Sequence, residues 1–326
     1  MLQHPSVTII LPALDEVEFI DQTLSDLLGQ DYEGPIEVIV ADGGSSDGTL
    51  EKLAVWSARD QRLKVIDNAS KRQAFGLNLA ASAATGEILV RADGHTSFAA
   101  DYVRRSVEAL AETGGAVGGR MNPLGRSPFG RGVAAAMNSP LTMGPGKFHH
   151  ALRREEVDTV YLGAFSRADF GDLRGFRHFP SGSSEDSDFY FRWRKSGRKV
   201  FVDPAIISSY AHRDSSGSLW QQYFRYGLGK SEMLWVNGRL PSARPLAPVA
   251  LVLTLAVAGL VGLLEGLWWP LLGVLAAWIS LLGWVGIRSR EPAWRVMFAA
   301  GIMHVAYGLG TLWGLVRGPR SVKGVR

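Results

Sequence analysis

Asp93, Gly94 and His95 form an Asp-x-His sequence that could hold a metal ion. They follow a short apolar run, residues 88–90, which is typical of a buried strand. In open α/β sheets, ligands bind outside the carboxyl ends of the strands, and a carboxylate with an imidazole suits Mn²⁺ among other metals. The sequence therefore predicts a metal site here. The alternative is a strand-ending turn, in which Asp and Gly supply turn geometry and the histidine is incidental.

Two earlier predicted strands also lead into acidic residues. Residues 7–11 precede Glu16, and residues 36–41 run directly into Asp42, whose following glycines would let a ligand approach the backbone. Strands and helices alternate from the first strand to Asp93, which predicts an α/β fold with a mainly parallel sheet and helices on both faces. The carboxyl ends of parallel strands lie along one edge, so the three acids predict a shared site.

The remaining segments are predicted mostly as further helices and strands. They are helices ending near Leu28 and Ser57, a strand over 63–67, helices over 71–84 and 99–113, a strand or turn over 116–120, and strands over 200–202 and 206–210. Residues 128–146 are small, apolar and broken by Gly and Pro. They are predicted to be either a loop packed on the domain or a segment at a membrane interface.

Composition and missing motifs exclude several classes of site. The chain has no cysteine, which rules out disulfides and thiolate metal ligands. It has no G-x-G-x-x-G after the first strand and no P-loop, so a bound phosphate would need a metal and side-chain cations. A glycine-rich basic loop near the N-terminus, as a sugar nucleotidyltransferase needs, is also missing. The N-terminus does not look like a signal peptide, which favours a cytoplasmic location.

Three ordered motifs resemble those of family-2 glycosyltransferases with the GT-A fold. They are Pro12-Ala-Leu-Asp-Glu16, Ala41-Asp-Gly-Gly-Ser-Ser-Asp-Gly-Thr49 and the segment around Asp93. The sequence from Lys71-Arg-Gln to Val90-Arg-Ala-Asp-Gly-His-Thr96 is most similar to ExoA-like (succinoglycan-type) exopolysaccharide glycosyltransferases. The resemblance extends beyond residue 230.

The resemblance implies a site for a nucleotide-sugar, with a UDP-sugar expected as donor. It implies nucleotide contacts from five residues: Pro12, Ala13, Glu16, Asp42 and Arg72. It makes Asp93 a ligand of Mn²⁺ or Mg²⁺ on the donor diphosphate. The usual Asp-x-Asp motif is altered, and we interpret His95 as standing in place of its second Asp. Arg91 then either faces the phosphates or packs structurally.

Residues 184–197 read as a helix with acids in its first turn and basic residues before a final glycine. One interpretation is that Glu185, Asp186 and Asp188 merely complement the helix dipole. The resemblance implies more, because this stretch is similar to the family's Glu-Asp motif. It makes Asp186 the catalytic base and places Glu185 at the acceptor site.

Two further features follow along the chain. His212 is either a structural residue or, by resemblance, a third metal ligand. Gln222 and Arg225 resemble the Gln-x-x-Arg-Trp motif at the acceptor and diphosphate, with Tyr226 replacing the Trp, which argues against a processive synthase. The aromatic and basic residues around them also indicate an amphipathic interfacial helix.

The C-terminal part is hydrophobic and basic. Stretches 246–264 and 267–287 are long enough to cross about 30 Å of hydrocarbon, and 293–316 is a weaker third. From Arg239 onward, nine Lys or Arg face only two acids, which gives +7 and leaves −3 for residues 1–238 of a total of +4. This favours a membrane surface over nucleic acid as partner. The positive-inside rule places both ends of the first helix pair in the cytoplasm. A third crossing would then put the basic C-terminus outside, against that rule.

These observations predict a cytoplasmic GT-A catalytic domain (1–215), an amphipathic interfacial segment (216–245) and a membrane domain (246–326) of a multi-pass inner-membrane protein. The predicted reaction is inverting transfer of a sugar to a hydroxyl of a polyprenyl-diphosphate-linked saccharide, in exopolysaccharide or cell-envelope glycan synthesis. Two alternatives are a polyprenyl-phosphate glycosyl synthase, whose anionic acceptor needs no base, and a catalytically inactive membrane scaffold.

Overall fold

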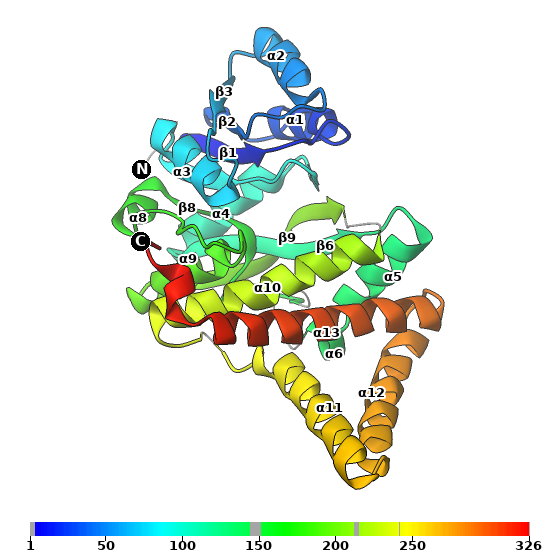
Figure 1. Cartoon of the computed structure of the whole chain (residues 1–326). Helices are drawn as coiled ribbons and strands as arrows, with labels where there is room; N and C mark the ends of the chain where they lie inside the picture. Colours follow the sequence, from blue (N-terminus) through cyan, green and yellow to red (C-terminus); the bar gives the residue numbers. More distant parts are fainter. Residues whose placement is uncertain (1–3, 144–150, 212–214, 241, 326) are drawn as a thin grey trace.

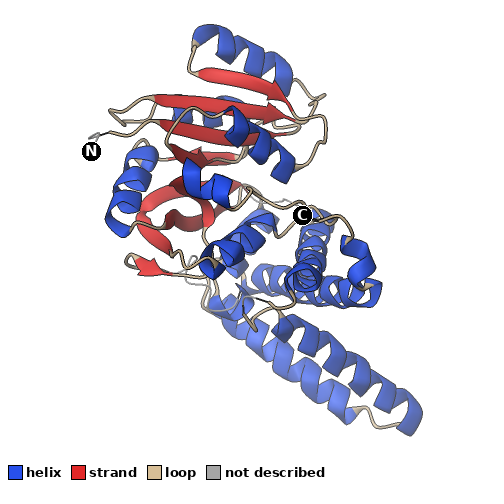
Figure 2. Ribbon diagram, turned by 90° about the vertical axis from the view of Figure 1, so that its left-hand side faces the viewer, coloured by secondary structure: helices blue, strands red, loops and turns tan. Residues whose placement is uncertain are grey.

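A mixed sheet forms the centre of the N-terminal part of the chain (Figures 1 and 2). The computed structural model describes residues 4–143, 151–211, 215–240 and 242–325. The strands are β1 (Val7–Ala13), β2 (Ile36–Asp42), β3 (Leu63–Asp67), β4 (Ile88–Arg91), β5 (Thr96–Phe98), β6 (Ala116–Leu124), β7 (Glu155–Glu156), β8 (Tyr161–Ser166) and β9 (Val200–Ala211). Their order is β3-β2-β1-β4-β8-β6-β9-β5, with β7 beside β9. The first four strands are parallel, as predicted, whereas β8 runs antiparallel to β4 and β6.

Helices cover both faces of the sheet, because alternate residues of each strand point to opposite sides. Ile9 and Leu11 join a core with α1 (Ile20–Leu28), α2 (Thr49–Arg59) and α4 (Tyr102–Thr113). Ile10 joins the other core, with α3 (Gln73–Ala83), α8 (Arg167–Asp172) and α9 (Glu185–Lys195). The predicted α/β architecture with two helical layers is confirmed.

Two predicted segments have a different structure, and the sequence did not predict β5, β7, β8 or α8. Residues 128–137 and 140–143, expected as loop or interfacial segment, form the helices α5 (Pro128–Met137) and α6 (Pro140–Met143). Ser127 caps α5, since its Oγ accepts from the Gly130 N–H at 2.9 Å. The two strands expected over 200–202 and 206–210 are one strand, β9. Its pairing with β6 shifts register after Asp203, so a bulge accommodates Pro204.

The C-terminal part consists of four long helices and a short 3₁₀ turn. They are α10 (Ser216–Asn237), α11 (Leu246–Glu265), α12 (Trp269–Ile287), α13 (Ala293–Arg317) and η1 (Pro319–Val322). The last three long helices could cross a membrane by length and composition, with mean hydropathies of 2.4, 1.9 and 1.4. Figure 1 shows α11 and α12 as a hairpin that projects from the molecule, while α13 runs across its base beside α10.

Glycines bring α10 and α13 into backbone contact. A Cβ added at Gly310 would lie 2.1 Å from the Phe224 carbonyl oxygen, and one added at Gly227 would lie 2.1 Å from the Tyr307 carbonyl oxygen. Ser231 Oγ also donates to the Thr311 carbonyl at 2.7 Å. The two helices therefore form one packed unit.

We expect Gly310→Ala to destabilise the protein. The added methyl would meet backbone that cannot move aside, and overpacking of this kind costs about 1–3 kcal/mol. Gly301→Ala in the same helix is the matched control, because its nearest neighbour would be Leu282 Cδ1 at 3.8 Å. That change should leave stability equal or slightly higher, since Ala favours helix over Gly. Thermal unfolding of the detergent-solubilised variants measures this, and equal melting temperatures for the two would contradict the packing described.

Candidate active site

The ends of three parallel strands lie side by side at one edge of the sheet. Ala13 at the end of β1 pairs with Asp42 at the end of β2, and Ile10 pairs with Arg91 at the end of β4. The sheet thus brings the loops after these strands together, as the sequence predicted. Among the predicted nucleotide contacts, Pro12 and Ala13 belong to β1 itself.

Asp42 shapes the loop that follows it. Its carboxylate is buried and accepts hydrogen bonds from the Gly44 N–H (2.7 Å), the Ser45 N–H (2.9 Å) and Ser45 Oγ (2.6 Å). Ser45 Oγ also accepts from the Asp15 N–H at 2.9 Å, which ties this loop to the one after β1. Asp42 therefore has a structural role, and its contact with a nucleotide stays a prediction.

Glu16 and His95, predicted separately as nucleotide contact and metal ligand, touch each other. His95 Nδ1 lies 2.9 Å from Glu16 Oε1. The His95 ring also packs against Tyr210, with ring centroids 5.0 Å apart. His212 lies outside the described residues, and within those described no three His, Asp or Glu side chains form a metal-binding group. The carboxylate and imidazole of Asp93 and His95 have the donor chemistry for Mn²⁺, but their role as ligands stays a prediction.

Arg91 lies behind Asp93 and is buried. Its Nε and Nη2 lie 3.2 and 3.4 Å from the two oxygens of Asp93. Burial alone would lower the pKa of Arg91, but Asp93 and then the carboxylates at the start of α9 outweigh it and raise that pKa above its usual value. Arg91 is therefore a fixed buried cation. The sequence left two roles open for Arg91, and the contact with Asp93 supports the structural one.

Gln73, at the first position of α3, connects Arg91 to the other half of the site. Its side-chain oxygen accepts from Arg91 Nη2 at 2.8 Å, and its nitrogen donates to Glu185 Oε1 at 3.1 Å. This chain of contacts links the end of β4 to the start of α9. The sequence did not predict a role for Gln73, although this residue belongs to the Lys71-Arg-Gln segment that carries the family resemblance.

Glu185 and Asp186 form the first turn of α9. Burial, and secondarily the neighbouring Asp186, raises the pKa of Glu185 to about 7. Asp186 is less buried, and its Oδ1 accepts from the Ser187 N–H at 2.6 Å. Asp188 differs from both: it is fully buried and pairs with Arg192 at 2.7 Å, so it is structural.

Lys230 of α10 contacts the first turn of α9. Its Nζ donates to Ser187 Oγ at 2.6 Å, and burial lowers its pKa despite the attraction of Asp186. The sequence suggested Lys230 only as part of an interfacial helix.

Two more contacts from α10 hold the loop before α9. Ser183 Oγ donates to the Arg225 carbonyl at 2.8 Å, and the Ser181 N–H donates to Glu232 at 3.1 Å. Gly229 permits this close approach, because a Cβ there would lie 2.2 Å from Ser183 Oγ. The loop and the first turn of α9 are therefore packed on α10.

The predicted acceptor residues of α10 lie at the same edge. Gln222 Nε2 donates to the hydroxyls of Tyr210 (3.2 Å) and Tyr226 (2.8 Å). Since Tyr210 packs on His95, these residues adjoin the end of β4. The Arg225 side chain is exposed.

Arg72, another predicted nucleotide contact, lies directly before α3. Burial lowers the pKa of His178, and the positive charge of Arg72 lowers it further.

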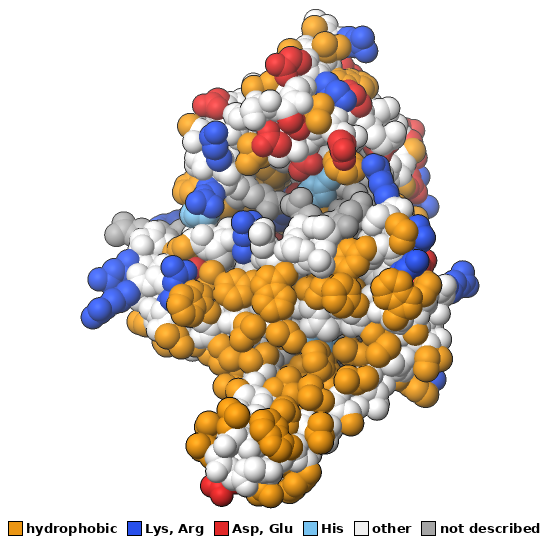
Figure 3. Space-filling view, turned by 45° about the vertical axis from the view of Figure 1, so that its right-hand side comes forward, with side chains coloured by type: hydrophobic (Ala, Val, Ile, Leu, Met, Phe, Trp, Pro, Cys, Tyr) orange, Lys and Arg blue, Asp and Glu red, His pale blue; other side chains and the backbone are white. Residues whose placement is uncertain are grey.

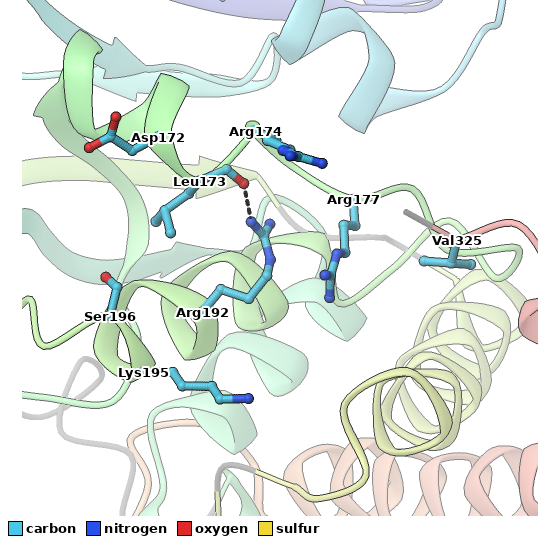
Figure 4. Close-up of a pocket in the computed structure, with 8 residues that line it drawn as sticks. All are labelled: Asp172, Leu173, Arg174, Arg177, Arg192, Lys195, Ser196 and Val325. Carbon is cyan, nitrogen blue, oxygen red and sulfur yellow. Dashed lines mark hydrogen bonds between the residues drawn. The ribbon is translucent and has the colours of Figure 1, made fainter.

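A separate hollow of about 590 Å³ lies along α9 toward its C-terminal end (Figure 4). Arg192 there donates to the carbonyls of Leu173 and Gly175 at 2.5 and 2.7 Å, in addition to its pairing with Asp188. Its donors are used to hold the loop after α8. None of the predicted site residues lines this hollow.

Comparison with known proteins agrees with this arrangement. The family model for glycosyl transferase family 2 matches residues 8–157. The succinoglycan biosynthesis protein ExoA of Rhizobium meliloti is 30% identical over 95% of this chain and 94% of its own. The chain belongs to glycosyltransferase family 2.

Two further relatives cover nearly the whole chain. A dolichyl N-acetyl-α-D-glucosaminyl phosphate 3-β-D-2,3-diacetamido-2,3-dideoxy-β-D-glucuronosyltransferase of Methanococcus voltae is 22% identical over 97% of this chain and 99% of its own. The mannosyltransferase PcManGT of Pyrobaculum calidifontis, solved in complex with GDP-Man and Mn²⁺, covers 96% of this chain and 88% of its own at 22% identity, with a TM-score of 0.62. The predicted GT-A fold is confirmed.

The raised pKa of Glu185 makes stability depend on pH. The folded protein holds this proton more tightly than the unfolded chain, so stability falls as pH rises from about 4.5 to about 7. The loss approaches about 3 kcal/mol, at 1.36 kcal/mol per pKa unit. Glu185→Gln removes this pH dependence. The melting temperature of the variant minus that of the parent should therefore be more positive at pH 8 than at pH 5. Other charged residues also face Glu185, and both the parent and the variant keep them: Arg91, Asp93, Asp186 and Lys230. A difference in melting temperature that is the same at both pH values would contradict the assignment.

Proposed function

We propose that this family-2 enzyme transfers a sugar, with inversion, from a nucleoside-diphosphate sugar to a hydroxyl of a lipid-linked saccharide. The observation that carries the proposal is the position of Glu185 and Asp186. They start α9 directly across from the end of β4, and Arg91 and Gln73 connect the two. A donor on the strand ends and an acceptor beside α9 would then meet between them.

Asp186 would act as general base. It is partly accessible and lies in the first turn of α9. It would take the proton of the acceptor hydroxyl as that oxygen attacks the anomeric carbon from the side opposite the leaving diphosphate. Glu185, more deeply buried, would orient the acceptor rather than accept the proton.

The loops after β1, β2 and β4 would hold the donor. The nucleotide, which we expect to be UDP, would contact Pro12, Ala13, Glu16, Asp42 and Arg72. Asp93, with His95 and His212, would hold Mn²⁺ or Mg²⁺, which when bound neutralises charge on the diphosphate. Arg225 would assist with its positive charge, and Gln222 and Tyr226 would line the acceptor side.

A lipid-linked acceptor and a membrane location agree with the relatives and with the apolar helices. The Methanococcus voltae relative is named for a dolichyl-phosphate-linked sugar, and the Rhizobium meliloti relative for an exopolysaccharide. The proposed site is the cytoplasmic face of the inner membrane, because basic residues flank the α11–α12 hairpin at its two ends.

Asp186→Asn tests the base. The amide keeps the size of the side chain and can still accept from the Ser187 N–H but cannot take a proton, so transfer should fall by about 10²–10⁴-fold. Donor binding should barely change, because the residues proposed to hold it are elsewhere. Asp172→Asn is the matched control, since its side chain is 64% exposed and pairs with Arg198 at the surface. Sugar transfer to a lipid-linked acceptor and release of nucleoside diphosphate are the measurements. Near-full transfer by Asp186→Asn would favour an acceptor that is already an anion, such as a polyprenyl phosphate.

Asp93→Ala tests the metal site by binding as well as by turnover. We expect EDTA to abolish transfer and Mn²⁺ or Mg²⁺ to restore it in the parent enzyme. The variant should lose Mn²⁺ binding in the presence of nucleoside diphosphate, followed by electron paramagnetic resonance. Asp172→Asn should bind Mn²⁺ like the parent. Full activity of the parent in chelator would rule out this role for Asp93.

A further inference from the structure

The surroundings of α13 differ from those of the other two apolar helices. By length and mean hydropathy all three could cross a membrane, but 44% of the most apolar window of α13 is buried in the protein, against 17% for α11 and α12. Its buried residues include Val296, Ala300, Met303 and Ala306, which pack with α5, α10 and α12. Most of one face of α13 is therefore already covered by protein.

The helix that covers α13 cannot itself enter hydrocarbon cheaply. α10 meets α13 from Phe224 to Trp235, whose Nε1 donates to the Gly314 carbonyl at 3.2 Å. Within this stretch α10 carries Arg225, Lys230 and Glu232, and it holds the loop before α9. A charged side chain at the centre of a bilayer is costly because it loses its hydration. An α13 that crossed the bilayer would draw these charges and the catalytic turn in with it.

The large exposed apolar residues of α13 lie toward its two ends and form one apolar stripe, with the half-buried Ile302 and Val305 between them. Its large exposed apolar residues are Trp294, Phe298, Leu309, Trp313 and Val316. Their spacings of 4, 11, 4 and 3 place them on one side of a helix with 3.6 residues per turn. Figure 3 shows hydrophobic side chains gathered in a band at this level and over the hairpin, with charged side chains above the band. The stripe is thus continuous with the surface of the hairpin.

Basic residues stand at both ends of α13. Arg288 and Arg290 precede it, and Arg317, Arg320 and Lys323 end or follow it. A crossing helix would put these two groups on opposite sides of the membrane, whereas a helix in the surface plane keeps both on one side. The second arrangement satisfies the positive-inside rule and places both groups at the level of anionic lipid headgroups.

We infer that α13 lies in the plane of the membrane surface, with its stripe against the lipid, and that the chain crosses the bilayer only through α11 and α12. The partner of this surface is the headgroup and upper acyl region of the bilayer. The inference rests on packing and charge and does not depend on the proposed chemistry.

Single cysteines test the arrangement, because the chain has none of its own. Arg290→Cys and Lys323→Cys, both at exposed positions on either side of α13, should react with a membrane-impermeant maleimide from the same side of sealed vesicles. Glu265→Cys, in the hairpin turn, should react from the other side. Lys323→Cys reacting from the side opposite Arg290→Cys would overturn the inference, whichever side Glu265→Cys reports.

Depth measurements provide an independent test at the middle of the helix. A fluorophore on Leu309→Cys should be quenched more by a spin label near the lipid headgroups than by one deep in the acyl chain. Val257→Cys, in the middle of α11 and 60% exposed, should show the reverse. Val55→Cys on α2, 47% exposed and far from the hairpin in Figure 1, should be quenched by neither. A Leu309 probe that behaves like Val257, or like Val55, would overturn the inference. Activity and thermal unfolding of each labelled variant show that it is folded.

Discussion

The buried guanidinium of Arg91 is the charge on which the arrangement of the site depends. Three carboxylates, those of Asp93, Glu185 and Asp186, lie in or near one poorly solvated region, and without a cation their repulsion would separate β4 from α9. Arg91 contacts the first directly and the second through Gln73. Removing one partner of a buried charge network typically costs several kcal/mol, because the remaining charges are left uncompensated. The same residue thus fixes the end of β4 and the start of α9 relative to each other.

The acceptor side has a second support, which comes from the C-terminal helices. The loop before α9 is bonded to α10 at Arg225 and Glu232, and Lys230 reaches Ser187. Close backbone packing at Gly227 and Gly310 joins α10 in turn to α13. The first turn of α9 is therefore held between a sheet edge and a pair of helices from a part of the chain more than 30 residues away in sequence.

The sequence predicted the parallel strands and the residues at their ends, because apolar runs followed by acids and glycines are local signals. It missed β8, since a strand that inserts antiparallel between β4 and β6 depends on pairing partners distant in the chain. It divided β9 at Pro204, because the bulge that tolerates the proline is set by the register with β6. The contact between Glu16 and His95 and the role of Arg91 were equally out of reach, as both depend on how distant loops meet.

The charge balance of the site gives a physical reason for the unusual residue at position 91. With Arg91 in that position, one positive charge is built in, and burial raises the pKa of Glu185 so that it gives up its charge most readily. Environments that separate the proton affinities of neighbouring carboxylates divide their tasks between them. Asp186, the less buried of the pair, is the carboxylate that the proposed mechanism uses as the base.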